Sequence, residues 1–209
     1  MKRISAVLIA VLFLALSVEA KVDLPSVFGD NMVLQRNASV AFWGKADAGS
    51  KVTIKPSWTK AKTQVQADAD GKWFARVQTP EAGGPYTVTV SDGDKLVLNN
   101  VLIGEVWFCS GQSNMEMPLA VTDGAEDELE HCENPQIRFY SIPQNYVKGE
   151  NLNMFRFQYM DYSDPVWKKC TYDTAKDFSA IGYYTAKRIQ KNLGVPGGVI
   201  GCNWGCRMI

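Results

Sequence analysis

The pattern of apolar and polar positions changes character about halfway along the chain. Up to about residue 101, short runs rich in β-branched and aromatic residues alternate with turn signals such as Asp70-Gly71 and Asp92-Gly93. These runs predict strands at residues 40–43, 52–54, 73–77, 86–90 and 96–98. Short strands at this spacing are typical of a β-sandwich. We therefore expect an all-β sandwich domain over residues 21–103.

From Gly104 onward, predicted helices alternate with predicted strands. Strands are expected at residues 106–109, 136–140 and 199–202, the first of them buried, and a solvated helix at residues 123–130. A long loop is expected over residues 141–177. Since a helix followed by a strand is the rhythm of a parallel sheet, we expect residues 104–209 to form an α/β domain.

One predicted helix has clear signals at both ends. Ser179 is a good N-cap, and the flanking Phe178 and Tyr183 are spaced for a hydrophobic staple. Gly194 is suited to ending the helix, and Pro196 prevents its continuation. We expect a helix that starts after Ser179 and ends at about residue 193.

The first twenty residues have the pattern of a secretory signal peptide. Lys2 and Arg3 precede an apolar core, and Val18-Glu19-Ala20 places small residues at the cleavage positions. The apolar run is too short to span a bilayer comfortably, and no later stretch is apolar enough. We expect cleavage near Ala20, residues 1–20 to be removed, and export to the periplasm or the cell exterior.

Charge gives no sign of a nucleic-acid or membrane-surface partner. The chain has 22 basic and 22 acidic residues, and removal of Lys2, Arg3 and Glu19 with the leader leaves a net charge of −1. No basic face or charge run stands out. A neutral or singly charged sugar is compatible with this balance.

The five cysteines allow disulfides in an exported protein but leave at least one thiol unpaired. No Cys-x-x-Cys pair is present, and the Cys202–Cys206 spacing has no companion His or Cys pair for zinc. Cys109, in a predicted buried strand, is expected to pack as a small hydrophobe. We expect no metal site and no cofactor.

Three tryptophans fall within the expected β-sandwich. Trp43, Trp58 and Trp73 could form a platform on which a sugar stacks, but tryptophans in strands more often belong to the core. We expect Trp43 and Trp73 to be buried. Trp58, in a Pro-Ser-Trp loop, stays open between the two roles.

A cluster of small polar residues follows the strand at 106–109 and centres on Ser113. Open α/β sheets place their chemistry at the carboxyl ends of their strands, although such a cluster can also be a plain turn. Gln112 and Asn114 flank Ser113, and either contact a substrate or hold the turn through their amides. Glu116 is expected to begin a short helix rather than to act as a carboxylate partner of Ser113.

The stretch around this serine resembles the sialate O-acetylesterase family, a branch of the SGNH (GDSL-like) serine hydrolases. It reads GEVWFCSGQSNMEM at residues 104–117. Four more segments resemble the same family: LPSVFGDNMVLQR (24–36), FSAIGYY (178–184), GVP (194–196) and NWG (203–205). The resemblance implies an SGNH-hydrolase domain with a flavodoxin-like three-layer α/β fold. It also implies removal of O-acetyl groups from sialic acids or other acetylated glycans.

The resemblance also assigns roles to individual residues. Ser113 is the implied nucleophile, and its backbone N–H would stabilise the oxyanion together with the N–H of Gly205. The amide that the family supplies from a third block has no counterpart here.

The family's catalytic histidine lies in an Asp-x-x-His block that this sequence lacks. His131, the single histidine, lies instead between Glu130 and Cys132 at the end of the acidic helix, where a surface role is expected. The family's Trp-Gly-Gly-Thr is matched only by Trp204-Gly205 before the sequences diverge. We therefore expect an incomplete hydrolase domain that is inactive by itself. Its ending would result from a frameshift or premature stop, or the chain would be a genuine short variant.

Alternative functions remain. The serine loop would serve an acetylxylan-type esterase equally well, since nothing in the sequence identifies the sugar. The chain could also be a non-catalytic glycan-binding remnant, or a product without function.

Overall fold

The computed structural model describes residues 22–142 and 165–203. Within them, an eight-stranded mixed sheet has the order β4-β3-β6-β7-β10-β8-β9 with β1 added against β7, and β2 pairs with β5 in a second sheet. The strands are β1 (Val33–Gln35), β2 (Ser39–Lys45), β3 (Lys51–Pro56), β4 (Thr63–Gln66), β5 (Lys72–Gln78), β6 (Gly83–Ser91), β7 (Lys95–Gly111), β8 (Asn134–Ser141), β9 (Lys168–Cys170) and β10 (Gly197–Asn203).

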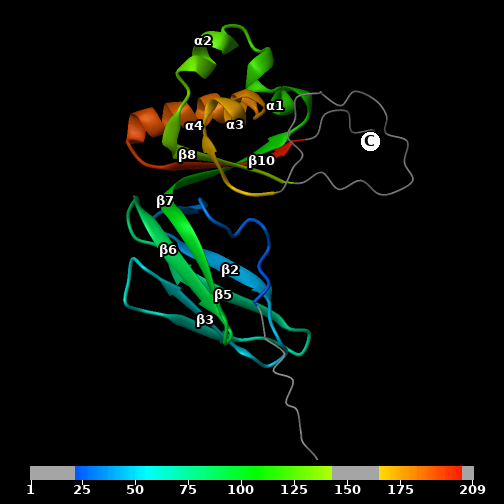
Figure 1. Ribbon diagram of the computed structural model, residues 1–209, viewed down its shortest axis with the longest axis vertical. Helices are drawn as coiled ribbons and strands as arrows, with labels where there is room; N and C mark the ends of the chain where they lie inside the picture. Colours follow the sequence, from blue (N-terminus) through cyan, green and yellow to red (C-terminus); the bar gives the residue numbers. More distant parts are fainter. Residues whose placement is uncertain (1–21, 143–164, 204–209) are drawn as a thin grey trace, which may run out of the picture.

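Among the described residues, helices occur only after residue 112. In Figure 1 they gather above β8 and β10, whereas β2, β3, β5 and β6 form the other half of the molecule. The helices are α1 (Ser113–Glu116), the 3-10 helix η1 (Leu119–Val121), α2 (Ala125–Glu130), α3 (Tyr172–Lys176) and α4 (Ala180–Leu193). The described residues thus form a mixed sheet with helices, and the helices begin after residue 104, where the α/β pattern was expected to start.

Buried and exposed side chains alternate along the early strands, and the buried ones form a hydrophobic core. In β5, Trp73, Ala75 and Val77 are buried and the residues between them are exposed, because successive side chains of a strand point to opposite faces. Trp73 is buried as predicted, but the prediction for Trp43 is wrong, since its side chain is 42% exposed. Phe42 occupies the inward position of β2, so its neighbour must face outward.

Strand β7 runs through both halves of the molecule. Its first part pairs antiparallel with β6, and its last seven residues pair in parallel with β10. Figure 1 shows it passing from the lower half to the upper half. The domain boundary expected between residues 103 and 104 therefore falls inside one continuous strand.

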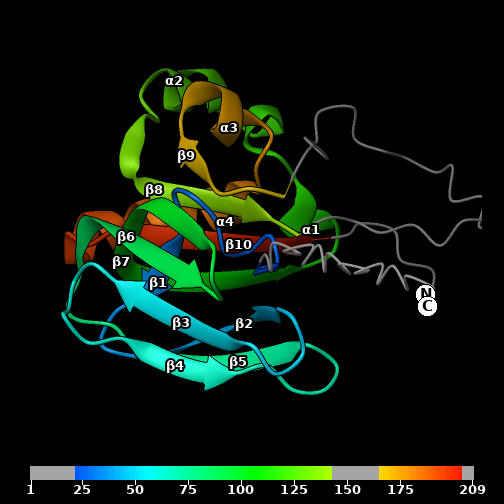
Figure 2. The ribbon, with the colours of Figure 1, turned by 60° about the horizontal axis from the view of Figure 1, so that its bottom comes forward.

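The parallel pairing expected after Gly104 is present. β10 lies between β7 and β8 and is parallel to both. Figure 2 shows α2 and α3 over β8 and β9, on the side away from β3 and β4. On the opposite face of this sheet, the opening segment reaches across: Trp167 Nε1 donates to the Val27 carbonyl at 2.8 Å, and Ser26 Oγ lies 2.7 Å from Tyr140 Oη.

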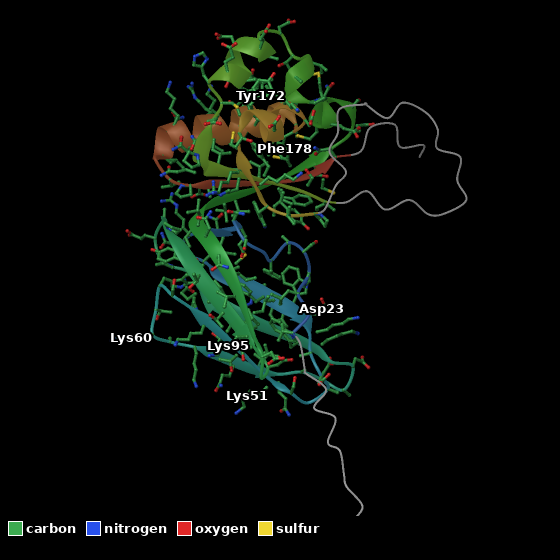
Figure 3. All side chains as sticks on the ribbon, viewed as in Figure 1. Asp23, Lys51, Lys60, Lys95, Tyr172 and Phe178 are labelled. Carbon is green, nitrogen blue, oxygen red and sulfur yellow. The ribbon has the colours of Figure 1, made fainter. Side chains whose placement is uncertain are left out.

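Helix α4 forms where its end signals predict. Ser179 is the N-cap, and its Oγ accepts a hydrogen bond from Gly182 N at 3.1 Å. Gly194 ends the helix with a φ of 66°, a left-handed conformation that suits glycine. Phe178 and Tyr183, the expected staple residues, both pack against Phe139, and Phe178 stacks on it with ring centroids 4.3 Å apart. Figure 3 labels Phe178 beside this sheet.

Two expectations for the second half are wrong in detail. The strand at 106–109 exists within β7, but it is not buried: Trp107 and Phe108 are 45% and 62% exposed. Over these residues β7 is paired only on the β10 side within the described part of the chain. The stretch predicted as a loop over 141–177 contains β9 and α3, and its residues 143–164 lie outside the described ranges.

Across residues 22–142 and 165–203, no helix has the length and apolar character needed to cross a bilayer. In the same ranges, His, Cys, Asp and Glu side chains nowhere gather in threes in a way that could hold a metal ion.

Candidate active site

Ser113 lies at the carboxyl end of β7, where the strand turns into α1. It is the first residue of α1, after Gln112 at the N-cap, and its carbonyl accepts a hydrogen bond from Met117 N at 3.0 Å. The side chain is exposed. Glu116 ends this one-turn helix rather than beginning it, and its side chain is buried. A reagent can therefore reach the Ser113 hydroxyl.

The N-terminus of α4 fixes the segment that follows Ser113. Met117 O accepts a hydrogen bond from Ala180 N, and Leu119 N donates to Phe178 O, both at 2.9 Å. These bonds form a short antiparallel bridge between Pro118 and the buried N-cap Ser179. The backbone at the start of α4 thus holds the segment that follows Ser113.

Close packing also limits the turn itself. A Cβ on Gly111 would lie 2.9 Å from the Met115 Cβ, so any larger residue would push α1 away from the end of β7. Met115 also contacts Ser179, whose Oγ lies 3.6 Å from the Met115 sulfur. Gly111, two residues before Ser113, therefore helps to set the position of the serine.

The flanking amides face solvent. Gln112 makes no side-chain capping bond to α1, so the interpretation that its amide holds the helix start is not supported. Gln112 and Asn114 are both exposed. Their side chains are available beside Ser113.

The end of β10 lies next to the serine turn. Asn203 is in register with Gly111, and Cys202 with Ser110, across the parallel pair β10–β7. Gly205, the second expected oxyanion donor, lies two residues beyond Asn203 and outside the described residues. Its position relative to Ser113 stays a prediction.

His131 lies at the C-cap of α2 and is exposed. Its Nδ1 is 2.9 Å from the Asp127 carbonyl, and this contact, with the nearby Asp127 charge, raises the pKa of His131. Within the described part of the chain, no side chain is hydrogen-bonded to the Ser113 hydroxyl. The exposed position of His131 at the end of α2 agrees with the expectation that it is a surface residue.

The anchoring role of Ser179 and Phe178 was not foreseen. The sequence identifies Ser179 as an N-cap, but it carries no local signal that the same backbone segment would bridge to residues 117–119. Such a contact between positions about sixty residues apart depends on how α4 docks on the sheet.

Comparisons with known proteins agree with the family resemblance of the segment around Ser113. The chain is 28% identical to the sialate O-acetylesterases of Homo sapiens and Pongo abelii over 192 residues, which is 86% of this chain and 36% of each relative. The rat enzyme is 27% identical over the same length. The chain thus spans little more than a third of the length of these curated relatives. No family model matches it.

A solved structure extends the similarity to three dimensions. A novel carbohydrate acetylesterase from Xanthomonas citri superimposes with a TM-score of 0.76 at 31% identity, over 88% of this chain and 41% of that protein. The resemblance to sialate O-acetylesterases is therefore confirmed: the chain is homologous to them over most of its length.

Proposed function

We propose that this chain carries the nucleophilic serine of a carbohydrate O-acetylesterase. The observation that carries the proposal is the exposed Ser113, held at the carboxyl end of a parallel strand by the N-terminus of α4, in a chain homologous to esterases. Ser113 Oγ attacks the acetyl carbonyl, the sugar oxygen leaves with a proton, and water then hydrolyses the acetyl-enzyme.

The surrounding groups take their roles from their placement. The oxyanion of the tetrahedral intermediate is stabilised by the Ser113 N–H and by the N–H of Gly205, which the β10–β7 register supports because Asn203 lies opposite Gly111. Gln112 and Asn114 are exposed, and the Gln112 side chain makes no capping hydrogen bond to α1. Both observations favour contact with substrate over support of the turn.

We further propose that the 209-residue chain alone is a poor catalyst. A serine hydroxyl needs a general base, and His131 is bound to its own helix instead. No Asp-x-x-His block occurs in the sequence. Since a triad works as a unit, loss of the base lowers the rate by several orders of magnitude.

The fold and the location follow the same family pattern. We infer that β7, β10, β8 and α4 belong to a flavodoxin-like SGNH domain and that the strands before residue 103 form a β-sandwich. Residues 1–20, outside the described ranges, are proposed to be a signal peptide that directs export. The substrate is proposed to be an O-acetylated sialic acid, as the names of the curated relatives suggest. Acetylxylan is the alternative, because the solved relative is called a carbohydrate acetylesterase.

Acetate release tests the proposal. The mature chain, its Ser113→Ala variant and its His131→Ala variant are incubated with O-acetylated sialic acid and with acetylxylan, beside the human enzyme. We expect slow release that depends on Ser113 and not on His131. Release that Ser113→Ala leaves unchanged, or a rate equal to that of the human enzyme, would contradict the proposal.

A second candidate function is glycan binding by the outer face of β2 and β5. Trp43 and Phe74 are cross-strand neighbours there, 42% and 55% exposed, and the Arg76 guanidinium lies 5.6 Å from the Phe74 ring. Lys45 and Lys72 form the next pair. Exposed aromatic rings stack on sugars, and the cations complement a carboxylated one. Titration with sialyllactose tests it: Trp43→Ala should abolish binding, and Val97→Ala, also at an exposed strand position, should not.

A further inference from the structure

Two buried thiols lie together where α2, β8 and β9 meet. Cys132 follows α2 by two residues and is 3% exposed; Cys170 ends β9 and is 2% exposed. The Cys170 thiol donates to the Cys132 carbonyl at 3.1 Å, which places the two residues in direct contact. Cys170 is in antiparallel register with Asn134, two residues beyond Cys132.

This geometry is close to that of a disulfide. A disulfide needs Cα atoms about 4.4–6.8 Å apart and a sulfur–sulfur bond of about 2 Å. The Cys170 sulfur touches the backbone of Cys132, and the pairing of Cys170 with Asn134 holds the two backbones side by side, so rotation of the side chains can bring the sulfurs together. Both thiols are free in this structure.

We propose that Cys132 and Cys170 form a disulfide when the chain folds in an oxidising compartment. The proposal rests on the proposed export only in naming that compartment. The two thiols lose two protons and two electrons as the sulfur–sulfur bond forms. A small-molecule disulfide such as oxidised glutathione accepts them, its own bond breaks, and two glutathione thiols are released.

The reaction belongs to folding rather than to the finished fold. Burial raises the pKa of Cys170 to about 12 and raises the pKa of Cys132 as well. Because the thiolate is the reactive form, the buried pair is nearly inert once the core has closed. Oxidation must therefore precede the packing of β9 on β8.

The other two described cysteines serve as an internal control. Cys109 is in register with Gly201 on the adjacent strand, so Cys202, one residue further, points to the opposite face of the sheet. Both are only partly buried. Cys109 and Cys202 are adjacent in the fold but unable to pair with each other, and both should remain free.

The cross-link would close a loop that contains both β8 and β9. Cys132 lies two residues before the start of β8, and Cys170 is the last residue of β9. A covalent link between these positions would hold β9 against β8 in addition to their backbone pairing.

Peptide mapping tests the proposal on the full mature chain. The reduced, unfolded chain is refolded in a glutathione redox buffer. The folded monomer is isolated, unfolded in denaturant without reductant, alkylated, and digested with trypsin and Glu-C. These proteases isolate Cys132 in residues 131–133 and Cys170 in residues 170–176. We expect these two peptides joined, two of the five cysteines protected from alkylation, and separation of the peptides on reduction.

Matched variants keep the outcome clear. Cys109→Ala should leave the link intact, and Cys132→Ala should leave Cys170 alkylated. Ser113→Ala should give the wild-type map, so failure of the proposed esterase leaves this test unaffected. Alkylated Cys170 in the folded wild-type monomer, or Cys170 joined to another cysteine, would overturn the proposal, and this holds even if Cys132→Ala fails to fold.

Discussion

Gly104 is the position where the strand that carries Ser113 comes closest to the turn before β10. A Cβ at this position would lie 1.9 Å from the Pro196 carbonyl oxygen and 2.6 Å from its carbon. Both are backbone atoms, so no side-chain rotation can relieve the overlap. The same carbonyl accepts a hydrogen bond from Glu105 N at 2.9 Å. Gly104→Ala must therefore move β7 relative to the turn that precedes β10.

The size of the effect follows from what that movement breaks. Loss of the Glu105–Pro196 hydrogen bond costs about 1 kcal/mol, and overpacking in a closed core costs about 1–3 kcal/mol. The lower entropy of unfolded alanine returns about 0.5–1 kcal/mol. We expect a net loss of about 1–3.5 kcal/mol, which is a substantial part of the ordinary stability of about 5–15 kcal/mol.

Gly197→Ala is the matched control, because Gly197 is in register with Glu105 and has nothing within 4 Å of a built Cβ. Urea unfolding of the mature chain is followed by tryptophan fluorescence. With a slope of about 2 kcal/mol per molar urea, Gly104→Ala should lower the midpoint by about 0.5–1.8 M. Gly197→Ala should shift it little. Equal midpoints for the two variants would refute the close approach of β7 and the β10 turn.

Two further predictions concern charge and the exposed aromatic face. Burial alone raises the pKa of Glu128, but hydrogen bonds from Lys187 and from Tyr183 Oη, the latter 2.5 Å away, outweigh it and hold the pKa below its usual value. Glu128 therefore stabilises the fold above its unfolded pKa of about 4.3, and the benefit is lost as pH falls through the lowered value. The difference in urea midpoint between wild type and Glu128→Gln should shrink in acid; a difference that grows would contradict this. Trp43→Ala should lower the urea midpoint modestly, since the side chain is 42% exposed but its ring packs edge-on against Phe28 at 4.7 Å. No loss at all would contradict this contact.

Local signals were enough to predict α4 and most strands. Ser179 and Gly194 define the ends of α4 through hydrogen-bonding and backbone preferences that neighbouring residues alone decide. The alternation of apolar and polar residues was enough to predict β5. In β2, the same alternation gives Phe42 the inward position and Trp43 the outward one. The exposure of that tryptophan follows from strand register rather than from residue type.

Contacts between distant segments could not be predicted. β1 pairs in parallel with β7 through residues about seventy positions apart, and the bridge between Pro118 and Ser179 depends on the docking of a whole helix. The sequence likewise identifies Ser113 and its flanking amides as candidates. It does not reveal that the support for the serine comes from α4, because backbone hydrogen bonds carry no side-chain signature.

Trapping of the acetyl-enzyme tests the role of Ser113 most directly. The leaving group of p-nitrophenyl acetate departs far more easily than a sugar oxygen, so slow acylation of Ser113 becomes measurable on long incubation, and the lack of a base also slows hydrolysis of the acetyl-enzyme. The mature chain is therefore incubated with this ester, digested with Glu-C, and examined by mass spectrometry for the peptide of residues 106–116. We expect one acetyl group on Ser113 that Ser113→Ala abolishes. Acetylation confined to Ser110, or acetylation of this peptide that persists in Ser113→Ala, would contradict the assignment of Ser113 as the nucleophile.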